Sequence, residues 1–166
     1  PWVFNFMEST TVPEGVADLM TEVAEAKVDV NLLGALPDEV YSQEGMRHLF
    51  YFKRPEEGLF SRNEKKHYVL PEAEVAGVIR AILLDRSRMD LFSKYLQDDE
   101  DTREIFVCTH GARDACCATF GYPVFKKIRD EYADRPELNM RVWRTSHTGG
   151  HRFAPTVLDY PEGRYW

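Results

Sequence analysis

Three cysteines and two histidines are the residues of this chain whose types and spacing are best suited to chemistry. Eight residues separate Cys108 from Cys117, which directly follows Cys116, and a Thr-Gly-Gly tripeptide separates His147 from His151. Thiolate sulfur and imidazole nitrogen are the ligands of zinc and of iron–sulfur centres. The pattern therefore indicates a metal site with two sulfur and two nitrogen ligands.

Counting ligands narrows the choice of metal. An all-cysteine iron–sulfur cluster needs four thiolates, and the chain has three cysteines. Two sulfurs and two imidazoles fit either tetrahedral zinc or a [2Fe-2S] cluster in which histidines replace cysteines on one iron. Zinc fingers place two to four residues between their cysteines, which disfavours zinc here. A cluster-free thiol oxidoreductase using Cys108 and Cys117 as a dithiol is a third hypothesis, although the chain has no Cys-x-x-Cys pair.

Each of these residues lies near the end of an expected element. Residues 104–107 form a strand-like run that leads into Cys108, and Cys117 opens a helical pattern. A helix N-terminus favours the thiolate form that binds metal. Two adjacent glycines would each cost about 1 kcal/mol inside a helix, so residues 147–151 are expected to form a loop around the metal.

Three further residues lie beside the expected ligands. His110, Arg113 and Asp114 occupy the loop between Cys108 and the helix. Such residues can hydrogen-bond cluster sulfur or fix the tautomer of a ligand imidazole, so we expect them to support the ligands. The alternative for Arg113 and Asp114 is a surface ion pair.

The remaining elements follow from periodicity and from turn residues. The apolar spacing predicts helices over 13–26, from residue 71 through 92, and from 117 to near residue 136. The helix that starts at residue 71 is expected to be the longest. Short β-branched or aromatic runs predict strands at 28–36, 48–53, 67–70, 104–107, 140–144, 156–160 and 164–166.

These elements predict an α/β fold made of two repeated halves, each thioredoxin-like. Residues 1–98 would form an N-terminal half without its opening strand, and residues 104–166 a C-terminal half without its closing helix. In such a half, the first strand is parallel to the second and is followed by an antiparallel hairpin. The second half carries the metal site.

Composition limits the partners. The net charge of -7 argues against nucleic acid and anionic membranes, and no apolar run approaches the roughly 20 residues that span a bilayer. We expect a cytoplasmic protein whose partner is a redox protein. The acidic charge favours partners with basic patches.

The motifs around the cysteines and histidines resemble those of the sucrase/ferredoxin-like family, which includes the fungal actin-patches-distal protein. The resemblance is carried by residues 107–111, 114–118, 120–123 and 144–156, with a weaker likeness at the Pro-Trp start of the chain. It implies a thioredoxin-like [2Fe-2S] protein whose ligands are Cys108, Cys117, His147 and His151. The family pattern has eight residues between its two ligand cysteines, so the resemblance implies Cys117 as the partner of Cys108 and leaves Cys116 as the runner-up ligand.

The resemblance implies electron transfer or redox sensing, and it favours an electron carrier over an enzyme with its own substrate. A zinc-stabilised interaction module is the alternative function. Glycoside hydrolysis needs a pair of carboxylates at a defined separation, and no such pair stands out among the 28 acidic residues. The word sucrase in the family name therefore finds no support in the residues.

Overall fold

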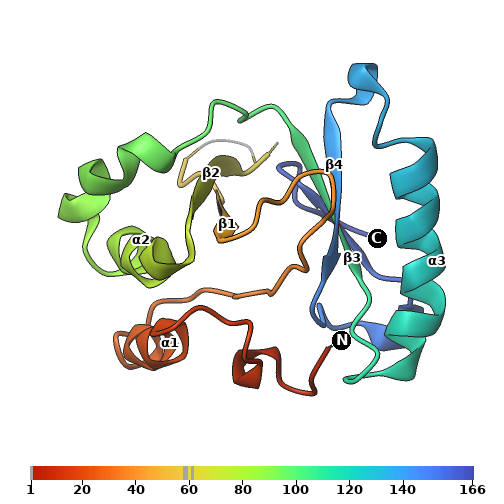
Figure 1. Ribbon diagram of the computed structural model, residues 1–166, viewed down its shortest axis with the longest axis horizontal. Helices are drawn as coiled ribbons and strands as arrows, with labels where there is room; N and C mark the ends of the chain where they lie inside the picture. The colour runs from red at the N-terminus through yellow and green to blue at the C-terminus, as the bar shows by residue number, and fades with distance from the viewer. Residues whose placement is uncertain (1, 58–59, 61) are drawn as a thin grey trace.

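The computed structural model describes residues 2–57, 60 and 62–166, and these form a mixed α/β fold with two sheets (Figure 1). The first part of the chain contains α1 (Val16–Glu25), β1 (Met46–Lys53), β2 (Glu64–Pro71), α2 (Val75–Leu83) and the 3-10 segment η3 (Arg86–Tyr95). The second contains β3 (Arg103–Cys108), α3 (Ala115–Glu131), β4 (Met140–Thr145), β5 (Val157–Tyr160) and β6 (Arg164–Tyr165). Short 3-10 turns are η1 (Phe6–Glu8), η2 (Glu72–Glu74), η4 (Pro136–Leu138) and η5 (His151–Phe153). Within the described residues, no helix is long and apolar enough to cross a membrane.

The first core lies between α1, α2 and the antiparallel pair β1–β2. Leu19 and Val23 of α1 pack with Leu70 of β2 and Val78 of α2, and all four side chains are buried. The apolar positions one helical turn apart explain why residues 16–25 form a helix with one buried face. The helix predicted over 13–26 is thus confirmed, as are the strands predicted at 48–53 and 67–70.

Two predictions for the first half are wrong. Residues 28–36 form no strand: their apolar side chains pack on the first core, and the backbone meets β4 through one isolated bridge, between Ala35 and Thr145. The helix from residue 71 is not the longest, because α2 ends at Leu83 and the chain continues as η3. Phe92 of η3 folds back onto Gly77 of α2, where an added Cβ would lie 3.1 Å from the ring. The apolar residues of η3 therefore cover α2 and do not extend it.

The second half has the predicted order of elements. Its sheet has the strand order β4-β3-β5-β6, with β3 parallel to β4 and antiparallel to β5. Ile105, Val107 and Val142 face α3, where Phe125 and Ile128 cover them. Because successive strand residues point to opposite faces, the intervening side chains of β3 and β4 project away from α3.

The opposite face of this sheet packs on the hairpin β1–β2, so the two halves are in contact (Figure 1). The ring of Phe50 lies edge-on to that of Phe106 at 5.7 Å, and the ring of Phe52 stacks on that of Tyr160 at 4.2 Å. Aromatic pairs at these separations contribute about 0.5–1.5 kcal/mol beyond the area that they bury. The arrangement fixes β3 and β4 between α3 and the hairpin.

Buried charges join the same two halves. Glu104 is fully buried and accepts hydrogen bonds from Lys65 Nζ at 2.7 Å, Trp143 Nε1 at 2.7 Å and Arg141 Nε at 3.1 Å. Asp99 accepts from His67 Nδ1 at 2.7 Å and from the same arginine. A buried ion pair offsets its desolvation only when such hydrogen bonds are complete. This network connects β2 with β3 and β4 at the end of the strands away from the cysteines.

Candidate metal centre

The end of β3 and the start of α3 bring Cys108 and Cys117 together, and both are buried. Asp114 begins α3 as its N-cap, with Oδ1 accepting the backbone N–H of Cys116 at 2.8 Å. A Cβ at Gly121 would lie 1.9 Å from the backbone oxygen of Cys108. Only glycine therefore permits the close approach of helix and strand that places the two sulfurs side by side.

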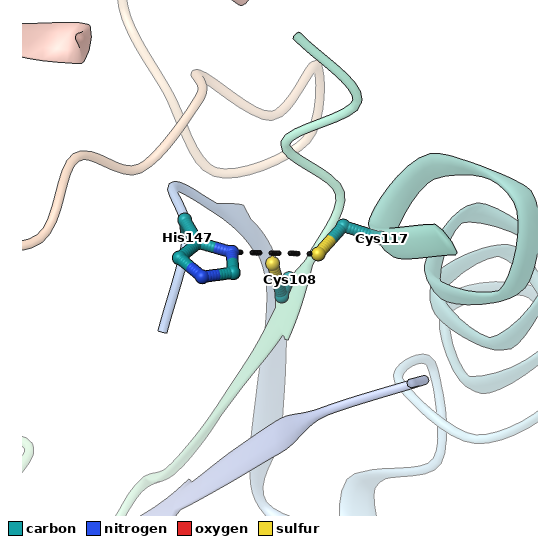
Figure 2. A group of neighbouring side chains, drawn as sticks. All are labelled: Cys108, Cys117 and His147. Carbon is teal, nitrogen blue, oxygen red and sulfur yellow. Dashed lines mark hydrogen bonds between the residues drawn. The ribbon is translucent and has the colours of Figure 1, made fainter. Parts of the chain in front are cut away.

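His147, which follows β4, completes a compact group of possible ligands. One ligand atom from each of Cys108, Cys117 and His147 lies within 4.8 Å of the others, and Figure 2 shows the three side chains converging. The Cys117 Sγ and His147 Nδ1 atoms are 3.5 Å apart. Three residues spread over 40 positions of the sequence thus meet at one point, as their predicted role as ligands requires.

His151 lies outside this group. Its side chain is 48% exposed, its Nε2 is 3.8 Å from Asp114 Oδ2, and its ring centre is 5.7 Å from that of His147. Gly149 and Gly150 both have positive φ, of 84° and 65°, so the segment forms the loop that was predicted. The loop holds His151 next to the group, with its imidazole turned toward Asp114.

His110 positions the loop that carries His147. It is buried, and its Nδ1 accepts the backbone N–H of His147 at 3.1 Å. Since Nδ1 is the acceptor, the proton lies on Nε2, which donates to the backbone oxygen of Val3 at 2.6 Å. The ring of Trp2 stacks on His110 with the ring centres 5.0 Å apart, and its Nε1 donates to Thr109 Oγ1 at 3.2 Å.

The other candidates lie at the surface of the site. Cys116 is exposed and its sulfur is not in the group of converging ligand atoms. The guanidinium of Arg113 lies 4.4 Å from the ring centre of Phe4. This contact with an aromatic ring replaces the ion pair with Asp114 that was one alternative from the sequence.

Burial determines the protonation of the group. Burial first, and then the neighbouring Cys108 thiol, raise the pKa of Cys117 to about 12. Desolvation, followed by the charges of His151 and Arg113, lowers the pKa of His147. At neutral pH these groups are a neutral thiol and a neutral imidazole. A metal would bind Cys117 by displacing its thiol proton, so the affinity for metal should rise with pH.

The donor set fits both metals considered. Zn–S bonds of about 2.3 Å and Zn–N bonds of about 2.0 Å place tetrahedral ligands roughly 3.5–3.8 Å apart. Cys117 Sγ and His147 Nδ1 lie at that spacing, 3.5 Å apart, and the ligand atom of Cys108 lies within 4.8 Å of both. A [2Fe-2S] cluster with one pair of ligands on each iron requires His151 to turn inward, and the two glycines before it supply the freedom for that rotation.

Some contacts of the site have no local signal in the sequence. The interactions of Trp2 and Val3 with the 109–110 segment cross more than 100 residues. The Pro-Trp start was noted in the resemblance, yet nothing in its spacing indicates a contact with His110. The buried network around Glu104 was also not predicted from the sequence, because no local pattern of residues indicates an ion pair between strands of different sheets.

Comparison with known proteins identifies the family. The family model described as sucrase/ferredoxin-like matches residues 1–166, the whole chain. The chain belongs to the sucrase/ferredoxin-like family. No curated protein and no solved structure gives a match. Membership in the sucrase/ferredoxin-like family agrees with a redox role, and the convergence of two cysteines and a histidine agrees with a metal site.

Proposed function

We propose that this protein carries a [2Fe-2S] cluster bound by Cys108, Cys117, His147 and His151, and that it works as an electron carrier or redox sensor. The observation that carries the proposal is the convergence of two buried sulfurs and one imidazole within 4.8 Å. When bound, the cluster would supply a one-electron couple. We also propose that residues 104–166 form a thioredoxin-like unit, which the order and directions of β3, β4 and β5 support.

The protein would contribute ligands, shielding and orientation. Cys108 at the end of β3 and Cys117 in the first turn of α3 are both buried, so water has little access to their sulfurs. His110 fixes the backbone of His147 through a hydrogen bond. Asp114 lies near His151 Nε2, where a carboxylate can orient a ligand imidazole through the ring nitrogen that does not bind metal.

A zinc-stabilised interaction module is the second candidate. It is favoured by one observation: Cys117 Sγ and His147 Nδ1 lie 3.5 Å apart, the spacing of two ligands on a single tetrahedral ion. A cluster-free thiol oxidoreductase is the least supported, since a thiol with a pKa of about 12 contributes almost no nucleophilic thiolate at neutral pH.

The content of iron, zinc and acid-labile sulfide in protein purified without air tests the proposal. The adjacent cysteines offer a matched pair of variants, Cys117→Ala and Cys116→Ala. We expect two irons and two sulfides per chain in the wild type and in Cys116→Ala, and a large loss of both in Cys117→Ala. One zinc without sulfide would support the interaction module, and equal loss in both variants would refute the assignment of Cys117.

A further inference from the structure

Exposed aromatic and cationic side chains lie next to the candidate ligands in two groups, residues 4 and 113 in one and residues 152 and 153 in the other. Phe4 and Phe153 are 61% and 82% exposed, and each is adjacent in sequence or space to an arginine, Arg113 or Arg152. We refer to these four residues as the rim. An exposed apolar patch with a polar or charged border marks a surface that contacts other molecules.

The rim lies on both sides of the outermost candidate ligand. Arg113 and Phe4 contact each other, and the backbone next to Phe4 accepts the hydrogen bond of His110. Arg152 and Phe153 directly follow His151 in η5, which packs on α3. Since His151 Nε2 lies 3.8 Å from Asp114 Oδ2, the segment that carries Arg113 and the segment that carries Arg152 meet beside the exposed candidate ligand His151.

The charge near the centre has the opposite sign to that of the whole chain. Residues 109–125 and 144–156 contain three arginines and one aspartate, a net charge of +2, whereas the chain carries -7. Within the part of the chain that the structure describes, Arg113 and Arg152 have no carboxylate within 4 Å. Their charges are thus available to a partner.

We infer that the rim docks a partner protein whose contact face is acidic around an apolar centre; under the proposed function, which this inference extends, that partner exchanges electrons with the cluster. Arginine and aromatic residues are the types enriched at the centres of protein interfaces. Complementary charge mainly accelerates encounter and suits the small, transient interfaces of redox partners. The net charge alone indicates the reverse, a partner with basic patches.

Two redox-inert paramagnetic ions of opposite charge test the rim. Hexacyanochromate(III), of charge -3, and hexaamminechromium(III), of charge +3, broaden the NMR signals of amides that they approach. At roughly 20 mM ionic strength we expect the anion to broaden the amides of residues 113, 152 and 153 at least about fivefold more than the cation does. The difference should disappear by about 0.5 M salt.

Matched variants separate the rim from the overall charge. Arg113→Glu/Arg152→Glu and Lys126→Glu/Lys127→Glu change the charge equally, but the two lysines lie on the outer face of α3, paired with Asp130 and Glu131. The arginine variant should lose the preference for the anion, and the lysine variant should keep most of it. Arg113→Gln/Arg152→Gln, a milder change, should reduce the preference without reversing it.

The outcomes distinguish this inference from the proposed function. Equal broadening by both ions at the rim, or the strongest broadening elsewhere on the chain, overturns the inference whatever metal is bound. Rim-specific broadening in protein without iron and sulfide supports the acidic partner but removes its redox role. With the cluster present, the electron of the reduced protein can be passed to hexacyanoferrate(III), forming hexacyanoferrate(II). The rate of that oxidation should then fall at least about threefold as salt rises, and a rate that increases with salt contradicts the inference.

Discussion

Substitution of His110 separates the two hydrogen bonds that this residue makes. His110→Gln retains a donor near the position of Nε2, which can still reach the Val3 oxygen, but it has no acceptor at the position of Nδ1. His110→Asn retains that acceptor for the His147 N–H and loses the bond to Val3. The two variants therefore test which bond holds the metal centre.

The size of the expected loss of metal affinity follows from the burial of His110. His110 is 2% exposed, so the His147 N–H loses its acceptor without gaining water, a cost of about 1–3 kcal/mol. In the metal-free variant the loop that carries His147 can move away and avoid this cost, but metal binding holds the loop in place and restores it. The metal affinity of His110→Gln should therefore fall about 5- to 150-fold. Val3 is 40% exposed, and water can replace the lost donor in His110→Asn. The affinity of that variant should change less than about fivefold.

Competition for Zn²⁺ with a chromogenic chelator measures this affinity, whichever metal the protein binds in the cell. Urea unfolding of the metal-free variants is the control, because it detects a general loss of stability. Equal affinities of the Gln and Asn variants, with similar unfolding curves, would refute the role of His110 in positioning His147.

Three further predictions concern the framework around the site. Glu104→Gln removes the charge shared by the buried Lys65 and the partly buried Arg141. It should lower the free energy of unfolding by about 3–5 kcal/mol in urea titrations followed by tryptophan fluorescence; a change below about 1 kcal/mol would contradict the network. Burial and then the neighbouring His67 lower the pKa of His48 from 6.5, so the unfolded chain binds the proton first as pH falls, and stability should decline from about pH 7 to 5. His48→Gln should flatten that slope, and an unchanged slope would exclude this histidine as its source. Gly121→Ala should disrupt metal binding, since its Cβ would lie 1.9 Å from a backbone oxygen, whereas Gly77→Ala, which meets only a ring edge at 3.1 Å, should bind metal normally.

The sequence was sufficient to predict the helices and strands whose buried residues follow a local pattern. The order of strands and helix in residues 104–166 was predicted correctly, because each strand is a short apolar run bounded by turn residues. Residues 28–36 show the limit of this reasoning. Their alternation of apolar side chains resembles that of a strand, but Val28, Val30 and Leu32 are partly buried against the first core, and only Ala35 of this segment has a strand partner. A periodic pattern of apolar residues indicates which side chains are buried, but it does not show that the segment itself forms a strand.

Part of the candidate site was also predictable from local features of the sequence. Cys108, Cys117 and His147 were recognised from residue type and spacing, and the structure brings them together. His110, Arg113 and Asp114 were recognised as neighbours of the ligands, but the contacts that they make were not predicted. His110 was expected to support a ligand, but its bonds to the backbone of residues 3 and 147 depend on contacts across more than 35 positions. Such pairings are set by the fold as a whole, and no local pattern encodes them.

The number of nitrogen ligands is the most direct test of the proposed centre. Pulsed EPR of the dithionite-reduced protein detects hyperfine coupling from nitrogen bound to iron. We predict couplings from two imidazoles, with one remaining in His147→Ala and one remaining in His151→Ala. A reduced protein without nitrogen coupling, or one that gives no EPR signal because it holds zinc, would contradict the two-cysteine, two-histidine cluster.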